Sequence, residues 1–122
     1  MKHKRPDKKN ALSILLAAQR EMQYTLTLAV SDEAGATIVR NICESFRMLG
    51  DALLLSRGIE AENHITPIKE LTQLTVHTQR PLQALDNLRR LRHNINHYGY
   101  QPRRKEVDDA IALAKSTLSP GF

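Results

Sequence analysis

The fold is decided by Ile38-Val39-Arg40-Asn41-Ile42-Cys43-Glu44-Ser45-Phe46-Arg47-Met48-Leu49-Gly50-Asp51-Ala52-Leu53-Leu54. Its apolar residues recur three and four positions apart, which predicts a long helix with one buried face. Ser31-Asp32-Glu33 supplies N-cap chemistry before this helix, because a Ser or Asp oxygen can accept from free backbone N–H groups. Gly58 can end the helix without strain, so we expect it to run to about Ser56.

The same spacing predicts a helix on each side of this stretch. The first runs from about Lys8 to Val30, with apolar positions at Leu12, Leu15, Leu16, Met22, Leu26 and Ala29. Another begins at Pro81, ends before Gly99, and carries an apolar line of Leu82, Leu85, Leu88, Leu91 and Ile95. A last helix runs from about Arg103 or Lys105 to Thr117, with Val107, Ala110, Ile111 and Ala114 facing inward.

The remaining segment is predicted as a loop over residues 59–66 and a short helix from Pro67 to about Val76. No segment shows the two-residue period of a strand. We therefore expect an all-α protein, an antiparallel bundle of four to five helices.

Length and composition indicate one domain and no membrane span. The 122 residues suit a single helical domain over 10–122, preceded by a basic tail over 1–9. The longest apolar run, Ala52-Leu53-Leu54-Leu55, is far below the ~20 residues that cross a bilayer. A lone Cys43 forms no internal disulfide, which favours a reducing, cytoplasmic location.

Positive charge is concentrated in two blocks of this chain, whose formal net charge is +5. Residues 1–9 carry five basic side chains against Asp7, a local charge of +4. Residues 89–105 carry Arg89, Arg90, Arg92, Arg103, Arg104 and Lys105 with no acid, a local charge of +6. Such blocks indicate a polyanion partner, although basic tails and solvated helix faces can also simply keep a small protein soluble.

Several kinds of catalytic and metal site are excluded by their missing motifs. The glycines are isolated, so no phosphate-binding loop exists, and neither a Gly-x-Ser-x-Gly elbow nor a His-Glu-x-x-His helix occurs. The carboxylate pairs Asp32-Glu33 and Asp108-Asp109 stand at predicted helix starts, where they complement the helix dipole. Cys43 lies in an apolar stripe and is expected as a small buried side chain. We therefore expect no metal and no cofactor.

One stretch is rich in groups that do chemistry: Arg92-His93-Asn94-Ile95-Asn96-His97-Tyr98-Gly99-Tyr100. On an ideal helix His93 and His97 share a face, whereas Arg92 and His97 lie about 140° apart. Joining Arg92 to His97 thus requires either unwinding near Asn96 or a second subunit. An imidazole that moves a proton and a guanidinium that binds phosphate suit attack by a ribose 2′-hydroxyl on its phosphodiester. Equally open is a structural role, in which the histidines cap helix carbonyls and Arg92 makes an ion pair.

These residues resemble the signature of the HEPN superfamily. That signature is an arginine, then a polar residue, and then a histidine four to six positions beyond the arginine. The likeness extends to Glu44–Glu60, similar to the family's long second helix, and to His64-Ile65-Thr66-Pro67-Ile68 with Leu71. It continues through Tyr98–Pro102 and through Glu106–Ile111 with Ala114, which resemble the last turn and helix of one group of small members.

The resemblance implies a dimerising helical bundle and metal-independent endoribonuclease activity, frequently as the toxin of a toxin–antitoxin or defence module. Arg92 would bind the phosphate, His97 would be the catalytic histidine, and His93 would be the polar neighbour of the arginine, where asparagine is most usual. The motifs of both subunits would line one cleft. RNA and an antitoxin protein are the implied partners. The alternative is a non-catalytic helical module that binds RNA, a nucleotide or a protein.

Two further expectations concern binding and assembly. Flanking phosphates would be held by Arg89, Arg90, Arg103, Arg104 and Lys105. Tyr98 and Tyr100 could stack on bases or pack against the bundle, and packing is favoured. The apolar line from Leu82 to Ile95, with the stripe of the helix around Phe46, offers more hydrophobic face than a small bundle needs. We therefore expect a symmetric homodimer.

Overall fold

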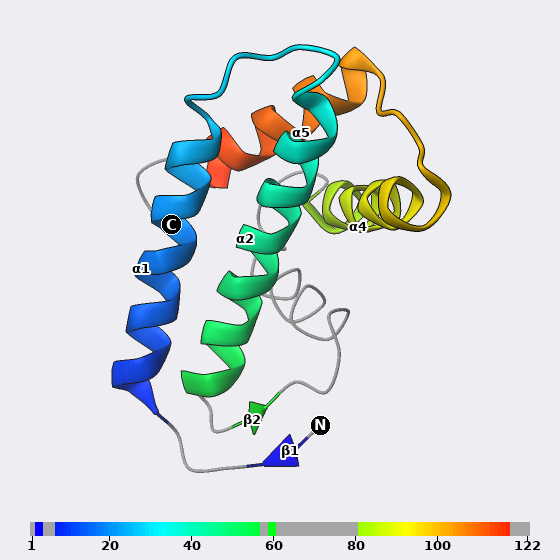
Figure 1. Ribbon diagram of the computed structural model, residues 1–122. Helices are drawn as coiled ribbons and strands as arrows, with labels where there is room; N and C mark the ends of the chain where they lie inside the picture. The colour runs from blue at the N-terminus through cyan, green and yellow to red at the C-terminus, as the bar shows by residue number, and fades with distance from the viewer. Residues whose placement is uncertain (1, 4–6, 57–58, 61–80, 118–122) are drawn as a thin grey trace.

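The apolar stretch around Phe46 forms α2 (Gly35–Ser56), the central helix of a computed structural model that describes residues 2–3, 7–56, 59–60 and 81–117. In these ranges three further helices pack against α2, namely α1 (Lys8–Thr25), α4 (Pro81–Tyr98) and α5 (Arg104–Thr117). The predicted all-α helical bundle is confirmed. α1 and α2 run antiparallel side by side, whereas α4 and α5 cross α2 (Figure 1).

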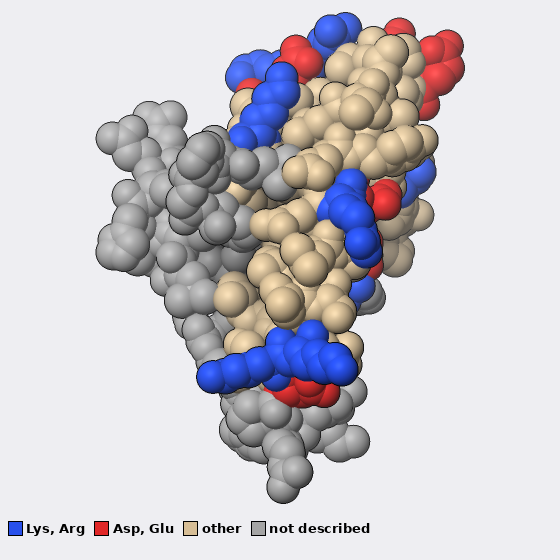
Figure 2. All heavy atoms as spheres, turned by 90° about the vertical axis from the view of Figure 1, so that its left-hand side faces the viewer, with Lys and Arg blue, Asp and Glu red and all other residues tan. Residues whose placement is uncertain are grey.

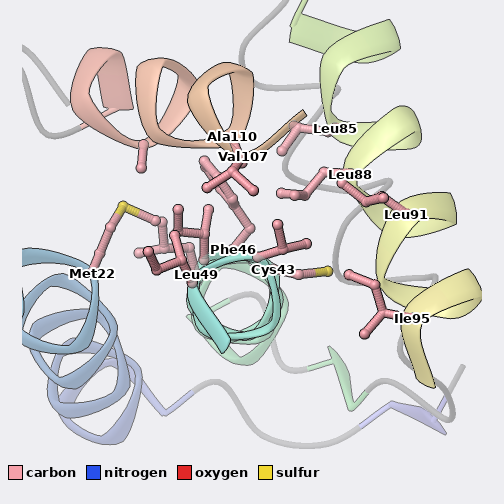
Figure 3. Packing of buried hydrophobic residues seen from close by; sticks show 14 of the residues in the cluster. Met22, Cys43, Phe46, Leu49, Leu85, Leu88, Leu91, Ile95, Val107 and Ala110 are labelled. Atoms are coloured by element: carbon pink, nitrogen blue, oxygen red, sulfur yellow. The ribbon is translucent and has the colours of Figure 1, made fainter. Parts of the chain in front are cut away.

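The core consists of aliphatic side chains around Phe46, which is 2% exposed. Figure 3 shows α1, α4 and α5 directing side chains towards α2 from three sides. Burying such side chains is the main favourable term in folding, and α2 joins the other helices through it. Cys43 is buried, as its place in the apolar stripe predicts. The cluster contains Ala18, Met22, Ile38, Val39, Ile42, Cys43, Phe46, Leu49, Leu85, Leu88, Leu91, Ile95, Val107, Ala110 and Ala114.

The start of α2 has its predicted cap, whereas the cap of α1 and a pair of short strands were not predicted. Ser31 Oγ accepts the N–H of Ala34 at 3.1 Å in the turn before α2, so the predicted capping chemistry is confirmed. Asp7 caps α1 in the same way by accepting the N–H of Asn10. The strands form an antiparallel pair of two residues each, β1 (Lys2–His3) and β2 (Ile59–Glu60). The division into a tail over 1–9 and a domain over 10–122 stays a prediction.

The first helix is shorter than predicted. α1 ends at Thr25, and the N–H groups of Thr27 and Leu28 donate to carbonyls three residues back, those of Tyr24 and Thr25. The prediction extended to Val30 because apolar residues continue along this loop, where Leu26, Leu28 and Val30 pack against the core. The predicted stripe is also partly wrong, since Leu12, Leu16 and Ala29 are exposed. The buried positions of α1 are Ala11, Ala18, Met22 and Thr25.

None of the helices in the described ranges is long and apolar enough to cross a membrane. The short helix predicted from Pro67 to Val76 lies outside the described residues, as does the predicted loop apart from β2.

Candidate functional site

α4 carries the candidate site on a continuous helix. It stays helical through Tyr98, so the unwinding near Asn96 that would have joined Arg92 to His97 does not occur. Gly99 then ends the helix with φ +65°, a conformation that L side chains rarely adopt. The N–H of Tyr100 turns back to the carbonyl of Asn94 at 3.2 Å. The side chains from Arg92 to Tyr98 therefore project in the directions that an unbroken helix gives them.

His93 and His97 form a contacting pair on the solvent side of α4. Both are exposed, and their ring centroids lie 4.3 Å apart with an interplanar angle of 33°. Within the described ranges neither imidazole hydrogen-bonds a helix carbonyl, so the capping role considered for them is not observed there. The pair is open to solvent and to a ligand.

Tyr98 extends this exposed aromatic group. Its ring meets His93 edge-on at 5.8 Å, and the residue is 75% exposed. The prediction that Tyr98 packs against the bundle is therefore wrong. Its side chain lies on the exposed side of α4 with the histidines, and not on the side that carries the buried leucines. The prediction is confirmed for Tyr100, which is partly buried and packs against the core.

Arg92 lies on another side of α4, facing α2. It is half-buried and close to the Cys43 thiol. Burial raises the pKa of that thiol, and the guanidinium of Arg92 only partly offsets the effect. No carboxylate pairs with Arg92 among the residues that the structure describes, so the ion pair considered for it is not observed. Arg92 and His97 of one chain thus face different directions.

Sequence reasoning missed Arg40, which reaches the motif from α2. Its Nε donates to Oδ1 of Asn96 at 2.8 Å, although the two residues are 56 positions apart in the chain. Arg40 is exposed and adds a second guanidinium to the side of α4 that carries Arg92. No local signal in the sequence marks it, because only the crossing of α2 and α4 brings it there.

Arg90 is the arginine on the histidine side of α4. It stands three residues before His93 and seven before His97, and this spacing places the three residues in one line along the helix. On an ideal helix Arg90 and His97 project only about 20° apart, compared with about 140° for Arg92 and His97. Arg90 was predicted only to hold a flanking phosphate. Of the three arginines on α4 from position 89 onward, Arg90 projects closest to His97.

The residues predicted to hold flanking phosphates, unlike Arg92, are all paired with acids that lie just outside the basic block. Arg89 and Arg90 both meet Asp86 at 3.0 Å, Arg103 meets Glu106, Arg104 meets Asp108 and Lys105 meets Asp109. The local charge of +6 is therefore partly compensated on the folded helices. The pairs of Arg90, Arg104 and Lys105 are exposed, and such pairs contribute roughly 0–1 kcal/mol each, so a phosphate could replace their carboxylates at small cost.

Glu106 organises the start of α5. Its Oε1 accepts the Tyr100 hydroxyl at 2.6 Å and the Arg103 N–H at 2.8 Å. The hydrogen bond to Glu106 raises the pKa of the Tyr100 hydroxyl, because it holds the phenolic proton. Partial burial alone would raise the pKa of Glu106, but these two hydrogen bonds and the charge of Arg103 outweigh it and lower that pKa.

Replacing Glu106 with glutamine keeps an acceptor for the Arg103 N–H but removes the negative charge that strengthens its two hydrogen bonds. The free energy of unfolding should therefore fall by about 1 kcal/mol at neutral pH. The lowered pKa of Glu106 means that its carboxylate stabilises the fold above pH 4.5, the ordinary value, and that this contribution is lost as the pH falls further. Denaturant unfolding at pH 7 and at about pH 3 should show a wild-type advantage that shrinks in acid. Asp108→Asn, in an exposed pair of α5, is the control. An equal deficit of Glu106→Gln at both pH values would contradict the assignment.

The apolar line of α4 is not a spare face. Leu85, Leu88, Leu91 and Ile95 are each 9% exposed or less, and they face the core of the same chain (Figure 3). This line therefore offers no surplus hydrophobic surface for a homodimer, and the homodimer stays a prediction. Besides Tyr98, the large exposed apolar side chains of the described residues lie on α1, at Leu12, Leu16 and Tyr24. Figure 2 shows the face on the α1 side as a mainly uncharged surface.

Comparisons with protein-family models, with curated proteins and with solved structures find no match for this chain. Within the described ranges, no three His, Cys, Asp or Glu side chains gather as a metal site requires. The site on α4 therefore has to be interpreted from its own geometry.

Proposed function

We propose that this protein is a metal-independent endoribonuclease of the HEPN type, acting as a toxin or defence component in the cytoplasm. The observation that carries the proposal is the exposed His93–His97 pair, with ring centroids 4.3 Å apart. Arginines flank the pair on α4, Arg90 on the same side and Arg92 towards α2. Imidazoles and guanidiniums together are the groups that RNA transphosphorylation uses.

The reaction needs a base and an acid. One group removes the proton of the ribose 2′-hydroxyl, which attacks the adjacent phosphorus, and another protonates the 5′-oxygen as its bond to phosphorus breaks. His97 is assigned the catalytic role and His93 assists it, because the two rings are in contact. A guanidinium would neutralise the charge that develops on the phosphate. The products are a 2′,3′-cyclic phosphate and a 5′-hydroxyl.

The phosphate-binding arginine is proposed to come from a second copy of the chain. Arg92 and His97 cannot meet on one unbroken helix. In a symmetric homodimer with the two α4 helices near the two-fold axis, Arg92 of the partner subunit would face His97. Arg90 is the alternative within one chain, since it lies in line with His93 and His97.

Surrounding residues would position the RNA. Arg103, Arg104 and Lys105 are exposed at the start of α5, whereas Arg89 is half-buried in its pair with Asp86. These pairs can open towards phosphates, those of the exposed residues most easily. The exposed ring of Tyr98 is available to stack on an unpaired base. Single-stranded or looped RNA is the expected substrate class, because its sugars can reach the in-line geometry. A dedicated antitoxin protein would be the partner that restrains such an activity.

Incubation of the purified protein with single-stranded RNA in EDTA tests the proposal. We expect cleavage that persists in EDTA, leaves a 2′,3′-cyclic phosphate, and fails where the scissile nucleotide has a 2′-deoxy sugar. Cutting of the deoxy substrate would exclude the mechanism, because no 2′-hydroxyl is present to attack. RNA binding without any cleavage would instead identify the chain as a binding module.

A further inference from the structure

A groove of about 570 Å³ lies between α4 and α5, and Arg90 is the one residue of its lining that has a role in the proposed chemistry. Its floor is apolar and includes Leu88, Leu91 and Ala110, which also belong to the core cluster. Figure 3 shows Leu88 and Leu91 directed from α4 towards the centre of the bundle, so the floor is a fixed part of the fold. The volume is ample for one nucleobase, and an apolar floor suits the face of an aromatic ring.

The two walls of the groove carry different chemistry. The α4 wall presents donors, Arg90 with the amides of Asn87 and Asn94, and the α5 wall presents the carboxylates of Glu106 and Asp109. Glu106 is held by Tyr100 and Arg103, which leaves Asp109 as the carboxylate for a ligand. A ligand that fills the groove should therefore offer acceptors to α4 and donors to α5.

We propose that this groove binds a guanine base. Guanine carries two acceptors side by side, O6 and N7, which match an arginine fork. It also carries two adjacent donors, N1–H and N2–H, which match the two oxygens of a carboxylate. Arg90 and Asp109 stand on opposite walls and supply these two groups. The other bases lack part of this pattern. Cytosine and adenine offer the carboxylate only one amino group, and uracil offers it only N3–H.

The ion pairs of these two residues do not block the groove. Arg90 reaches Asp86 through Nη2 at 3.0 Å and keeps further N–H donors, while its side chain is 69% exposed. Asp109 meets Lys105 at 3.3 Å, and its side chain is 68% exposed. Contacts this exposed cost little to rearrange.

The groove also adjoins the imidazoles. Asn94 lines the groove and projects about 60° from His97 on an ideal helix, and Arg90 projects about 20° from it. A base in the groove would bring its own ribose and phosphate towards the His93–His97 pair. The inference thus deepens the proposed function and rests on it for the RNA context, whereas base binding itself can be measured without cleavage.

Two pairs of neighbours in the sequence provide matched variants. Asp109 and Asp108 are adjacent on α5, and each pairs with the basic residue four positions earlier, but only Asp109 lines the groove. Arg90 and Arg89 both pair with Asp86, but only Arg90 lines the groove. Within each pair, the two substitutions remove the same charge, but only one of them alters the lining of the groove.

Binding should be measured by calorimetry for GMP, AMP, CMP and UMP, and for single-stranded RNAs that contain one guanine or none. The His97→Ala protein is used so that no RNA is cut. We expect GMP, or the guanine-containing RNA, to bind about tenfold to a hundredfold more tightly than its counterparts. Preference in the RNA alone would mean that a backbone contact is also needed, and preference for GMP as well would mean that free nucleotides bind.

Asp109→Asn and Arg90→Gln should each remove most of the guanine preference, whereas Asp108→Asn and Arg89→Gln should keep it. Equal affinity for all four bases, preference for another base, or equal effects of the two aspartate variants would overturn the inference. Cleavage of RNA without guanine preference would contradict the guanine site and support the proposed nuclease. Guanine binding without cleavage would support the guanine site and contradict the proposed nuclease.

Discussion

Replacement of Phe46 with alanine should lower the free energy of unfolding by roughly 3–5 kcal/mol. Phe46 is the largest fully buried side chain of the described core, and it lies on the helix that contacts α1, α4 and α5. Its removal loses the transfer energy of the ring and leaves a cavity that three neighbouring helices cannot all close. Small domains are stable by only about 5–15 kcal/mol, so the variant should lose a large share of that margin.

Denaturant unfolding followed by circular dichroism measures this loss, with Leu12→Ala as the control. Leu12 is 54% exposed on α1, so its truncation should cost about 0.5 kcal/mol or less. The comparison also tests the outer face of α1, which the sequence pattern had placed in the core. Equal losses in the two variants would mean that α1 buries Leu12, against the exposure described here.

The helices could be predicted from sequence because their signals are local. The period of three and four residues, together with Ser31, Pro81 and Gly99, predicted the presence of all four described helices. The end of α1 was predicted wrongly because apolar loop residues such as Leu28 pack on the core as helical residues would. Which face of α1 is buried depends on its neighbours, and the strand pair at Lys2–His3 depends on a segment far away in the chain.

The site was predicted as a set of residues but not as an arrangement. Local density marked His93 and His97, and their i,i+4 spacing predicted the shared face that the ring contact confirms. The partners of the basic block were missed because Asp86, Asp108 and Asp109 lie just outside the counted window. Arg40 and the groove beneath Arg90 depend on how α2, α4 and α5 cross, and no local pattern contains that information.

Mixed dimers should decide where the phosphate-binding arginine comes from, if the proposed nuclease is correct. Arg92→Ala and His97→Ala homodimers should each lose activity by about 10²–10⁴-fold, as expected when a phosphate-binding or proton-transfer group is removed. A dimer with one subunit of each kind retains one site that pairs an intact Arg92 with an intact His97 across the interface. Such a dimer should recover about half of the wild-type rate.

Two different affinity tags, used in succession, isolate the mixed dimer, and light scattering checks its mass against that of the 13.8 kDa chain. A site built within one chain makes the opposite prediction, because each subunit of the mixed dimer then lacks one essential group and the rate stays at background. In such a site Arg90 would be the phosphate-binding arginine, since it lies in line with His93 and His97. Full activity of the Arg92→Ala homodimer with loss of activity in Arg90→Ala would place the site within one chain. Recovery in the mixed dimer requires the shared site, because the unbroken α4 gives Arg92 no route to His97 of its own chain.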